Sequence, residues 1–149
     1  MRLPHAPTIG LLLLPLLTTG TETPYSDCGF TGSLVGLQLG SCREWPCVFE
    51  RGVPIAGEVL FKAVSNYRTL KTTINALFGG IAIPLYVDEQ MCTKLLIGQC
   101  PADIGESLSY LANLTVGHDL PTITVTLEWN IANGDGETVV CAQVPAQFH

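Results

Sequence analysis

Residues 122–131 read Thr-Ile-Thr-Val-Thr-Leu-Glu-Trp-Asn-Ile, and their side chains alternate strictly between polar and apolar. Successive side chains of a β-strand point to opposite faces, so this pattern predicts a strand that is buried on one face and exposed on the other. Residues 133–136, Asn-Gly-Asp-Gly, are a strong turn signal. The chain can then return along residues 138–144 as a partner strand.

Three further segments show the same period of two. Residues 55–63 and 70–78 alternate between apolar side chains and charged, hydroxyl or amide side chains. Residues 107–116 alternate too, although their leucines would also fit a short helix. Glycine turns such as Phe78-Gly79-Gly80 separate these runs. Several short strands of this kind in one small domain indicate a β-sandwich.

The chain begins with an apolar run that is too short to span a membrane. The run extends from Leu11 to Leu17, follows Arg2 and is interrupted by Pro15, whereas a spanning helix needs about 20 apolar residues. A basic start, a short apolar centre and small residues after it are typical of a secretory signal peptide. A buried N-terminal helix is the alternative, but the proline and the lack of amphipathic spacing argue against it. We therefore expect residues 1–20 to be a signal peptide and residues 21–149 to form one exported domain.

All six cysteines follow the proposed cleavage point, at positions 28, 42, 47, 92, 100 and 141. An even number in an exported domain indicates three disulfides, although spacing alone leaves about 15 pairings open. Zinc is a poor fit, because no cysteine pair has C-x-x-C spacing and only His118 and His149 remain after the signal peptide. A thioredoxin-like centre fails on the same spacing. We expect Cys42 and Cys47 to close a small loop, and we expect no metal and no cofactor.

The composition limits the classes of partner. Charged residues make up only 13% of the chain, its net charge is −6, and it has no cluster of lysine and arginine. Such a chain is a poor candidate for binding nucleic acid or anionic membrane surfaces. Its length suffices for a single core.

Several short motifs are spread along the chain from Asp27 to about Gln147. They are Asp27-Cys28-Gly29, Cys42 to Pro46-Cys47, Cys92 to Cys100-Pro101, Tyr110-Leu111, Pro121-Thr122-Ile123, Leu127-Glu128-Trp129 and Cys141-Ala142-Gln143-Val144-Pro145. The most specific feature is six cysteines in order with Glu-Trp between the last two. With these motifs the chain resembles the MD-2-related lipid-recognition (ML) family, and within it the Niemann-Pick type C2 branch that includes the group 2 mite allergens.

The resemblance implies an all-β, immunoglobulin-like sandwich of two antiparallel sheets with an internal lipid cavity. It also implies the disulfides Cys28–Cys141, Cys42–Cys47 and Cys92–Cys100. The function it implies is that of a monomeric, secreted or luminal protein that holds a sterol, fatty acid or other hydrophobic lipid between its sheets and transfers it. A membrane receptor or transporter that exchanges lipid is the partner expected, and the extracellular space or the lysosomal lumen is the expected location.

A lipid cavity needs an apolar lining, because apolar burial at about 25 cal/mol per Å² drives binding and an unsatisfied polar group would oppose it. The same residues would form an ordinary dry core, and only the resemblance favours a cavity. Val116, Leu120 and Leu85 match lining positions of the sterol-binding relatives. Those relatives tend to have aromatic residues at the positions of Leu85 and Leu120, so a fatty acid or other lipid is an alternative to a sterol. The expected lining residues are Phe61, Ile74, Phe78, Ile83, Leu85, Tyr110, Val116, Leu120, Val125, Leu127 and Trp129.

Two other classes of function compete with a lipid carrier. The chain has no G-x-S-x-G, H-E-x-x-H or nucleotide-binding glycine motif, so we expect no enzyme. Glu128 beside Trp129 could suggest a catalytic carboxylate, but alternation places it on the polar face, where a structural role is favoured. His118 is interpreted as a loop residue, with a pH sensor for lipid release as the alternative. The other class is a lipid-sensing immune co-receptor or accessory interaction module without carrier activity.

One glycosylation sequon occurs in the chain, Asn113-Leu114-Thr115. Alternation places Asn113 on the face opposite Leu108 and Tyr110, and therefore outward. We predict an N-linked glycan at Asn113.

Overall fold

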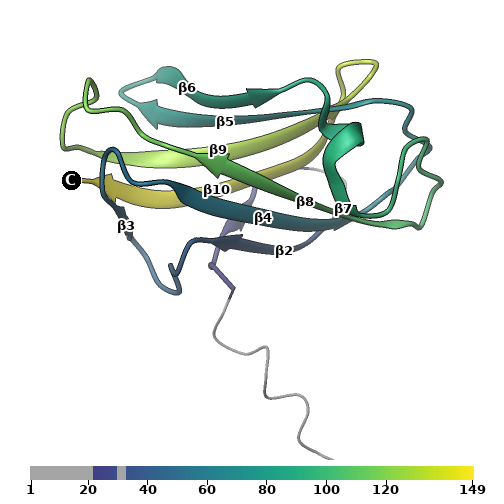
Figure 1. Ribbon diagram of the computed structural model, residues 1–149, viewed down its shortest axis with the longest axis horizontal. Coiled ribbons are helices and arrows are strands. Elements are labelled where there is room, and N and C mark those ends of the chain that lie inside the picture. Colours follow the sequence, from purple (N-terminus) through teal and green to yellow (C-terminus); the bar gives the residue numbers. More distant parts are fainter. Residues whose placement is uncertain (1–21, 30–32) are drawn as a thin grey trace, which may run out of the picture.

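Two β-sheets stack face to face, and their inner faces enclose the core (Figure 1). The computed structural model describes residues 22–29 and 33–149, so the predicted signal peptide, residues 1–20, lies outside the described residues. The described elements in chain order are β1 (Ser26–Asp27), β2 (Leu34–Leu39), β3 (Cys47–Phe49), β4 (Ile55–Lys62), β5 (Leu70–Phe78), β6 (Ile81–Asp88), the 3₁₀ helix η2 (Met91–Lys94), β7 (Leu95–Ile97), β8 (Ser107–Leu114), β9 (Thr124–Asn133) and β10 (Thr138–Phe148).

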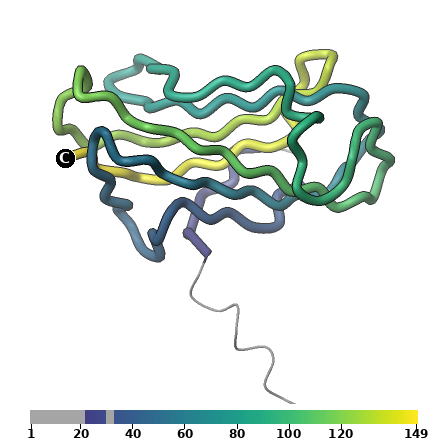
Figure 2. The backbone as a smooth tube through the Cα atoms, in the orientation of Figure 1, coloured from purple at the N-terminus to yellow at the C-terminus, as the bar shows by residue number. Residues whose placement is uncertain are grey.

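The larger sheet has the strand order β1-β10-β9-β5-β6, and β3 also pairs with β10. The smaller sheet has the order β2-β4-β8-β7. Figure 2 shows the last strand, β10 in yellow, running beside β9 through the larger sheet. Neighbouring strands are antiparallel, which confirms the predicted immunoglobulin-like sandwich. Among the described strands β3 departs from this rule, because it runs parallel to β10 with Cys47 opposite Ala146.

Most of the stretch at residues 122–131 lies in β9, which runs from Thr124 to Asn133, as its alternation predicts. Odd-numbered residues from Val125 to Ile131 are buried, and the even-numbered residues between them are partly exposed. The return strand β10 pairs with β9 but continues beyond residue 144 to Phe148. It continues because Ala146 and Phe148 keep the alternation and reach the core.

The other three predicted strands are β4, β5 and β8. The burial pattern of β4 alternates almost perfectly, with Val59 and Phe61 inside and Glu58 and Lys62 outside. Residues 107–116 provide β8, which pairs along its whole length with β4. The helical alternative for this segment is therefore wrong, because every residue of β8 has a partner in the ladder.

The three disulfides use all six cysteines and have the pairing that the family resemblance implies. Cys28–Cys141 joins the segment after β1 to the middle of β10. Cys42–Cys47 closes the loop between β2 and β3, and Cys92–Cys100 joins η2 to the segment after β7. Within the described part of the chain, no helix is long and apolar enough to cross a membrane.

Candidate functional site

A small apolar cavity lies between the two sheets. Both sheets contribute to its wall, which has no charged side chain, and the enclosed void is only about 10 Å³. The ten lining residues are Leu37, Leu39, Phe49, Ile55, Ile74, Leu114, Leu127, Trp129, Ala142 and Val144. A void of this size holds at most about one water molecule.

Trp129 is the largest side chain in this wall, and its one polar group is satisfied. Its indole Nε1 donates a hydrogen bond of 2.5 Å to the hydroxyl of Thr72, which is itself fully buried. An unpaired N–H in this apolar setting would carry the full desolvation cost of a buried donor. The hydrogen bond therefore leaves a wall that is apolar throughout.

The structure places all but one of the sequence-predicted lining residues in three groups. Ile74, Leu127 and Trp129 line the cavity. A second group is buried elsewhere in the core, and a third is only partly buried at its margin. Phe78 belongs to none of these groups, since it is 49% exposed at the end of β5. The buried group is Phe61, Tyr110, Val116 and Val125, and the marginal group is Ile83, Leu85 and Leu120.

Seven lining residues were missed by sequence reasoning, and some carried a usable signal. Ala142 and Val144 lie two apart in the predicted return strand, and Leu37 and Leu39 have the same spacing in β2. Extending the rule of alternation to these pairs would have found them. Phe49 carried no such signal, because β3 is only three residues long.

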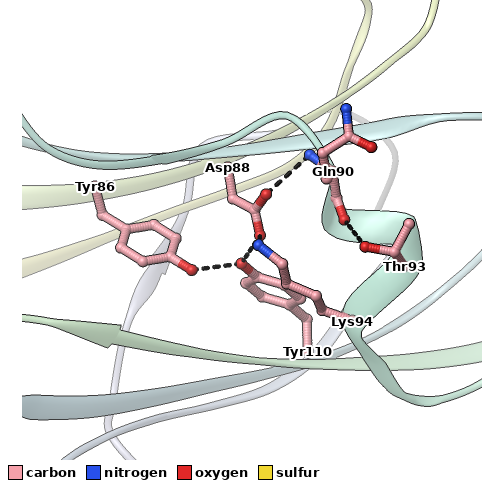
Figure 3. A network of polar contacts seen from close by, with 6 residues as sticks. All are labelled: Tyr86, Asp88, Gln90, Thr93, Lys94 and Tyr110. Atoms are coloured by element: carbon pink, nitrogen blue, oxygen red, sulfur yellow. Dashed lines mark hydrogen bonds and ion pairs between the residues drawn. The ribbon is translucent and has the colours of Figure 1, made fainter.

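A polar network crosses between the sheets beside this cavity (Figure 3). Tyr86 on β6 and Tyr110 on β8 point toward each other, with their hydroxyl oxygens 2.6 Å apart. The Tyr110 hydroxyl donates to Oδ2 of Asp88 at 2.5 Å. Lys94 Nζ donates to the same oxygen at 3.0 Å, and the backbone N–H of Gln90 donates to Oδ1 at 2.8 Å. The network joins the edge strand β6 of the larger sheet to β8 of the smaller one.

Two pKa values in the network are shifted by their surroundings. Burial raises the pKa of Tyr110, and its hydrogen bonds to Asp88 and Tyr86 raise it further. For Asp88 burial acts upward, but the hydrogen bonds from Tyr110, Lys94 and Gln90 outweigh it, so the net shift of its pKa is downward. Asp88 is therefore a carboxylate and Tyr110 a neutral phenol at neutral pH.

The loop that follows β8 is tied to the turn before β4. Arg51 Nη1 donates to the backbone oxygen of Leu120 at 2.7 Å and to that of His118 at 3.3 Å. The N–H of Gly52 donates to the Val116 oxygen at 2.8 Å. His118 lies so close to Gly52 that a Cβ there would be 2.5 Å from Nε2. Val116 and Leu120 are thereby held at one end of the sandwich.

Glu128 has a structural setting on the outer face of the larger sheet. Its carboxylate accepts hydrogen bonds from Asn130 Nδ2 and Gln143 Nε2, each at 2.7 Å. Glu128 also lies close to the sulfurs of Cys28 and Cys141. Those sulfurs are joined in a disulfide, so they are not thiolate ligands for a metal. Neither acid–base chemistry nor a metal centre is indicated at Glu128.

The predicted glycosylation site lies at the surface. Asn113 is exposed on β8, and glycosylation there stays a prediction.

A second hollow lies at the surface, between the Cys42–Cys47 loop and residues 48–56. It is far larger than the inter-sheet cavity, at about 880 Å³. That hollow is open to solvent and includes Ser41, Arg43 and Glu44 in its wall. It could not exclude water from an apolar ligand, so the enclosed inter-sheet cavity is the better candidate.

Comparisons with known proteins agree with this architecture. The family model described as the ML domain matches residues 22–148. The chain is 25% identical over 143 residues to NPC intracellular cholesterol transporter 2 of Bos taurus, covering 94% of this chain and 95% of that protein. It is also 25% identical over 128 residues to the homolog a of that transporter in Drosophila melanogaster, covering 83% and 86%.

Solved structures show the same fold at lower identity. A Niemann-Pick type C2 protein from Japanese carpenter ant aligns with a TM-score of 0.75 and 18% identity, covering 85% of this chain and 99% of that one. Chicken MD-1 complexed with lipid IVa aligns with a TM-score of 0.52 and 18% identity, covering 80% and 83%.

Proposed function

The chain belongs to the family of ML-domain proteins, and from this premise we propose that it binds a hydrophobic lipid between its two sheets and transfers it. A sterol, a fatty acid or a similar lipid is the proposed cargo. The observation that carries the proposal is the enclosed inter-sheet cavity, whose wall is apolar on both sheets. Relatives with similar sequences over nearly their whole length are named as cholesterol transporters. None of the catalytic arrangements considered in the sequence is favoured, so a carrier is proposed rather than an enzyme.

Binding requires the interior to open. Lipid and drug-sized ligands occupy cavities of roughly 300–1,000 Å³, whereas the void here is about 10 Å³. Apolar side chains such as Trp129, Leu127 and Ile74 must therefore move to admit a lipid. The lipid then replaces their mutual contacts with its own apolar surface, at about 25 cal/mol per Å² removed from water.

We further propose that the protein acts outside the cell or in the lysosomal lumen, as a monomer that exchanges lipid with a membrane receptor or transporter. The predicted signal peptide and the three disulfides support an exported protein. The exposed Asn113 supports an N-linked glycan.

The test begins with protein purified from a eukaryotic host. Native mass spectrometry should detect a bound lipid, and excess cholesterol or oleic acid should raise the midpoint of unfolding. A ligand at a hundredfold excess over its Kd stabilises the folded state by about 2.7 kcal/mol. If no lipid copurifies and neither probe shifts the midpoint, the carrier function is rejected and an interaction module without carrier activity becomes the better account.

A matched pair of variants locates the binding site. Ala142→Phe adds an aromatic ring to the wall of the cavity, whereas Ala82→Phe adds the same ring at an exposed position of β6. The first should abolish lipid binding and the second should leave it unchanged. Circular dichroism shows whether Ala142→Phe folds, because overpacking a core costs about 1–3 kcal/mol.

A further inference from the structure

The network of Tyr86, Asp88 and Tyr110 is an unusual feature in the core of this protein. Among the described residues, Asp88 is the charged residue that is buried, with 6% of its surface exposed. Tyr110 is completely buried, and Tyr86 is partly exposed on the edge strand β6. Buried polar groups of this kind are costly unless every donor and acceptor is used. Any donor or acceptor that the network leaves unused is therefore available to a ligand.

The direction of each hydrogen bond follows from the carboxylate. The Asp88 carboxylate can only accept hydrogen bonds, so the single hydroxyl hydrogen of Tyr110 must be donated to Oδ2 of Asp88. Tyr110 then has no hydrogen left for Tyr86, and the 2.6 Å contact between the two hydroxyls requires Tyr86 to be the donor. The hydroxyl hydrogen of Tyr86 is thereby used as well. Only lone pairs remain on the Tyr86 oxygen, so it can accept a further hydrogen bond but cannot donate one.

The register of the larger sheet places Tyr86 beside the cavity. Tyr86 is the direct partner of Ile74, and Ile74 is in turn the direct partner of Trp129. Both Ile74 and Trp129 line the cavity. Neighbouring strands lie about 4.8 Å apart, so the ring of Tyr86 flanks the lining on the side of the β6 edge. A lipid that displaces the apolar lining beside this network, and leaves the network's hydrogen bonds intact, would bring its head group to the Tyr86 oxygen.

We propose that Tyr86 is the head-group acceptor of the lipid site and selects a lipid that carries a neutral hydroxyl donor, such as a long-chain alcohol or a sterol, over a carboxylate or a ketone. This inference rests on the proposed lipid-binding function. A hydroxyl group supplies the hydrogen that the Tyr86 oxygen lacks. A ketone offers only lone pairs, and a carboxylate adds a negative charge near the buried carboxylate of Asp88.

The ionisation of the network keeps this selectivity fixed at neutral pH. The pKa of Asp88 is shifted downward and that of Tyr110 upward. At neutral pH Tyr110 therefore remains the donor, and Asp88 the acceptor, of the hydrogen bond between them. Lys94 and the backbone of Gln90 hold the carboxylate in place from η2 and the turn before it.

Two matched pairs of lipids test the proposal at neutral pH. Oleyl alcohol and oleic acid differ only in the head group, and cholestanol and cholestanone differ only in a hydroxyl against a ketone. For each pair that binds, we expect the hydroxyl lipid to bind about ten-fold more tightly, which is the effect of one buried hydrogen bond. The neutral sterol pair, cholestanol and cholestanone, isolates the hydrogen bond from charge repulsion.

Tyr86→Phe and Tyr25→Phe provide the variant and its control. Tyr86→Phe should remove the preference by weakening the hydroxyl lipids alone, and Tyr25→Phe, outside the network, should keep it. Equal affinities in the wild type, or a preference that survives Tyr86→Phe, would overturn the head-group assignment while leaving a lipid carrier intact. Failure of all four lipids to bind would overturn the proposed function and this inference with it.

Discussion

Trp129 can reach across the interior because the residue that faces it is a glycine. A Cβ on Gly57 would lie 2.9 Å from Cζ3 of Trp129 and 3.1 Å from Cδ2 of Leu39. The hydrogen bond from the indole to Thr72 fixes the orientation of the ring. The two constraints together set where the indole lies, and therefore how little space the cavity retains.

Gly57→Ala should destabilise the protein although alanine is better suited to a strand than glycine. The new Cβ must displace Trp129 or Leu39, which costs about 1–3 kcal/mol in a packed core. Gly36→Ala is the control, because in β2 its Cβ would meet only the flexible end of Glu22. Urea unfolding followed by circular dichroism should give a lower midpoint for Gly57→Ala and an unchanged or raised one for Gly36→Ala. Equal midpoints would show that the indole is not held against β4.

At the scale of single residues, the sequence predicts which side chains are buried better than it predicts what they touch. Alternation is sufficient to place Leu127 and Trp129 inside. It does not show that Gly57 leaves room for the indole, because that depends on which strand of the other sheet faces β9. The same ambiguity explains Phe78, which continues the alternation of β5 but lies where the strand leaves the sandwich and is 49% exposed.

Among the elements, β6 and β8 are joined across the sheets by side chains as well as by the core. Asp88 and Tyr86 come from β6, Tyr110 from β8 and Lys94 from η2. The edge of the larger sheet is thereby fastened to the smaller sheet at one side of the cavity. Because the fastening depends on a carboxylate, its contribution to stability depends on pH.

Asp88→Asn should make the stability of the protein less sensitive to acid. The pKa of Asp88 in the folded state lies below its ordinary value of 3.8, so the unfolded chain binds the proton more readily. The stabilisation from Asp88 is therefore complete above about pH 4 and is lost as the pH falls through the lower, folded-state pKa. Asp88→Asn should be less stable than the wild type at neutral pH, with a difference that shrinks below pH 4.

Urea midpoints measured across the acid range provide the comparison. Asp103→Asn removes the same charge at an exposed position and serves as the control. It should follow the pH dependence of the wild type. An Asp88→Asn curve parallel to that of the wild type would show that the carboxylate adds nothing to the joint between β6 and β8.

The elements that the sequence predicts are those in which burial alternates. β4, β5, β8 and β9 each bury one face against the core, so their sequences carry a period of two, and β10 alternates from Ala142 onward. β6 is an edge strand with a shift in register opposite Ile74 and Asn75, and its burial does not alternate. The polar flank of the candidate site lies on this strand, which is why the roles of Tyr86 and Asp88 were not predicted.

At the scale of the whole molecule, the three disulfides divide into one long-range link and two local ones. Cys28 and Cys141 are separated by 113 residues, so their bond connects the start of the domain to its last strand. Cys42 and Cys47 are separated by only 5 residues, and Cys92 and Cys100 by 8. The family resemblance supplied this pairing, because spacing alone left the alternatives open.

Removing the long-range disulfide should cost more stability than removing a local one. Constraining the unfolded chain contributes about 4–5 kcal/mol for a loop of the length closed by Cys28–Cys141 and about 2 kcal/mol for that closed by Cys42–Cys47. The paired replacements Cys28→Ser/Cys141→Ser and Cys42→Ser/Cys47→Ser are well matched. Each introduces one serine at a buried position, since Cys141 is 7% and Cys47 1% exposed, and one at a partly buried position.

Because the two double replacements are matched in burial, the loss of packing is similar in both variants. The difference between their free energies of unfolding therefore reports the lengths of the two loops that the disulfides close. We expect the first variant to have a free energy of unfolding about 2–3 kcal/mol lower than the second, and to be secreted in lower yield because more of it is unfolded. Urea unfolding and the yield in the medium measure the two effects. If the variant without Cys42–Cys47 is the less stable one, then the small loop and the neighbouring β3–β10 pairing hold the sandwich together more than the long-range link does.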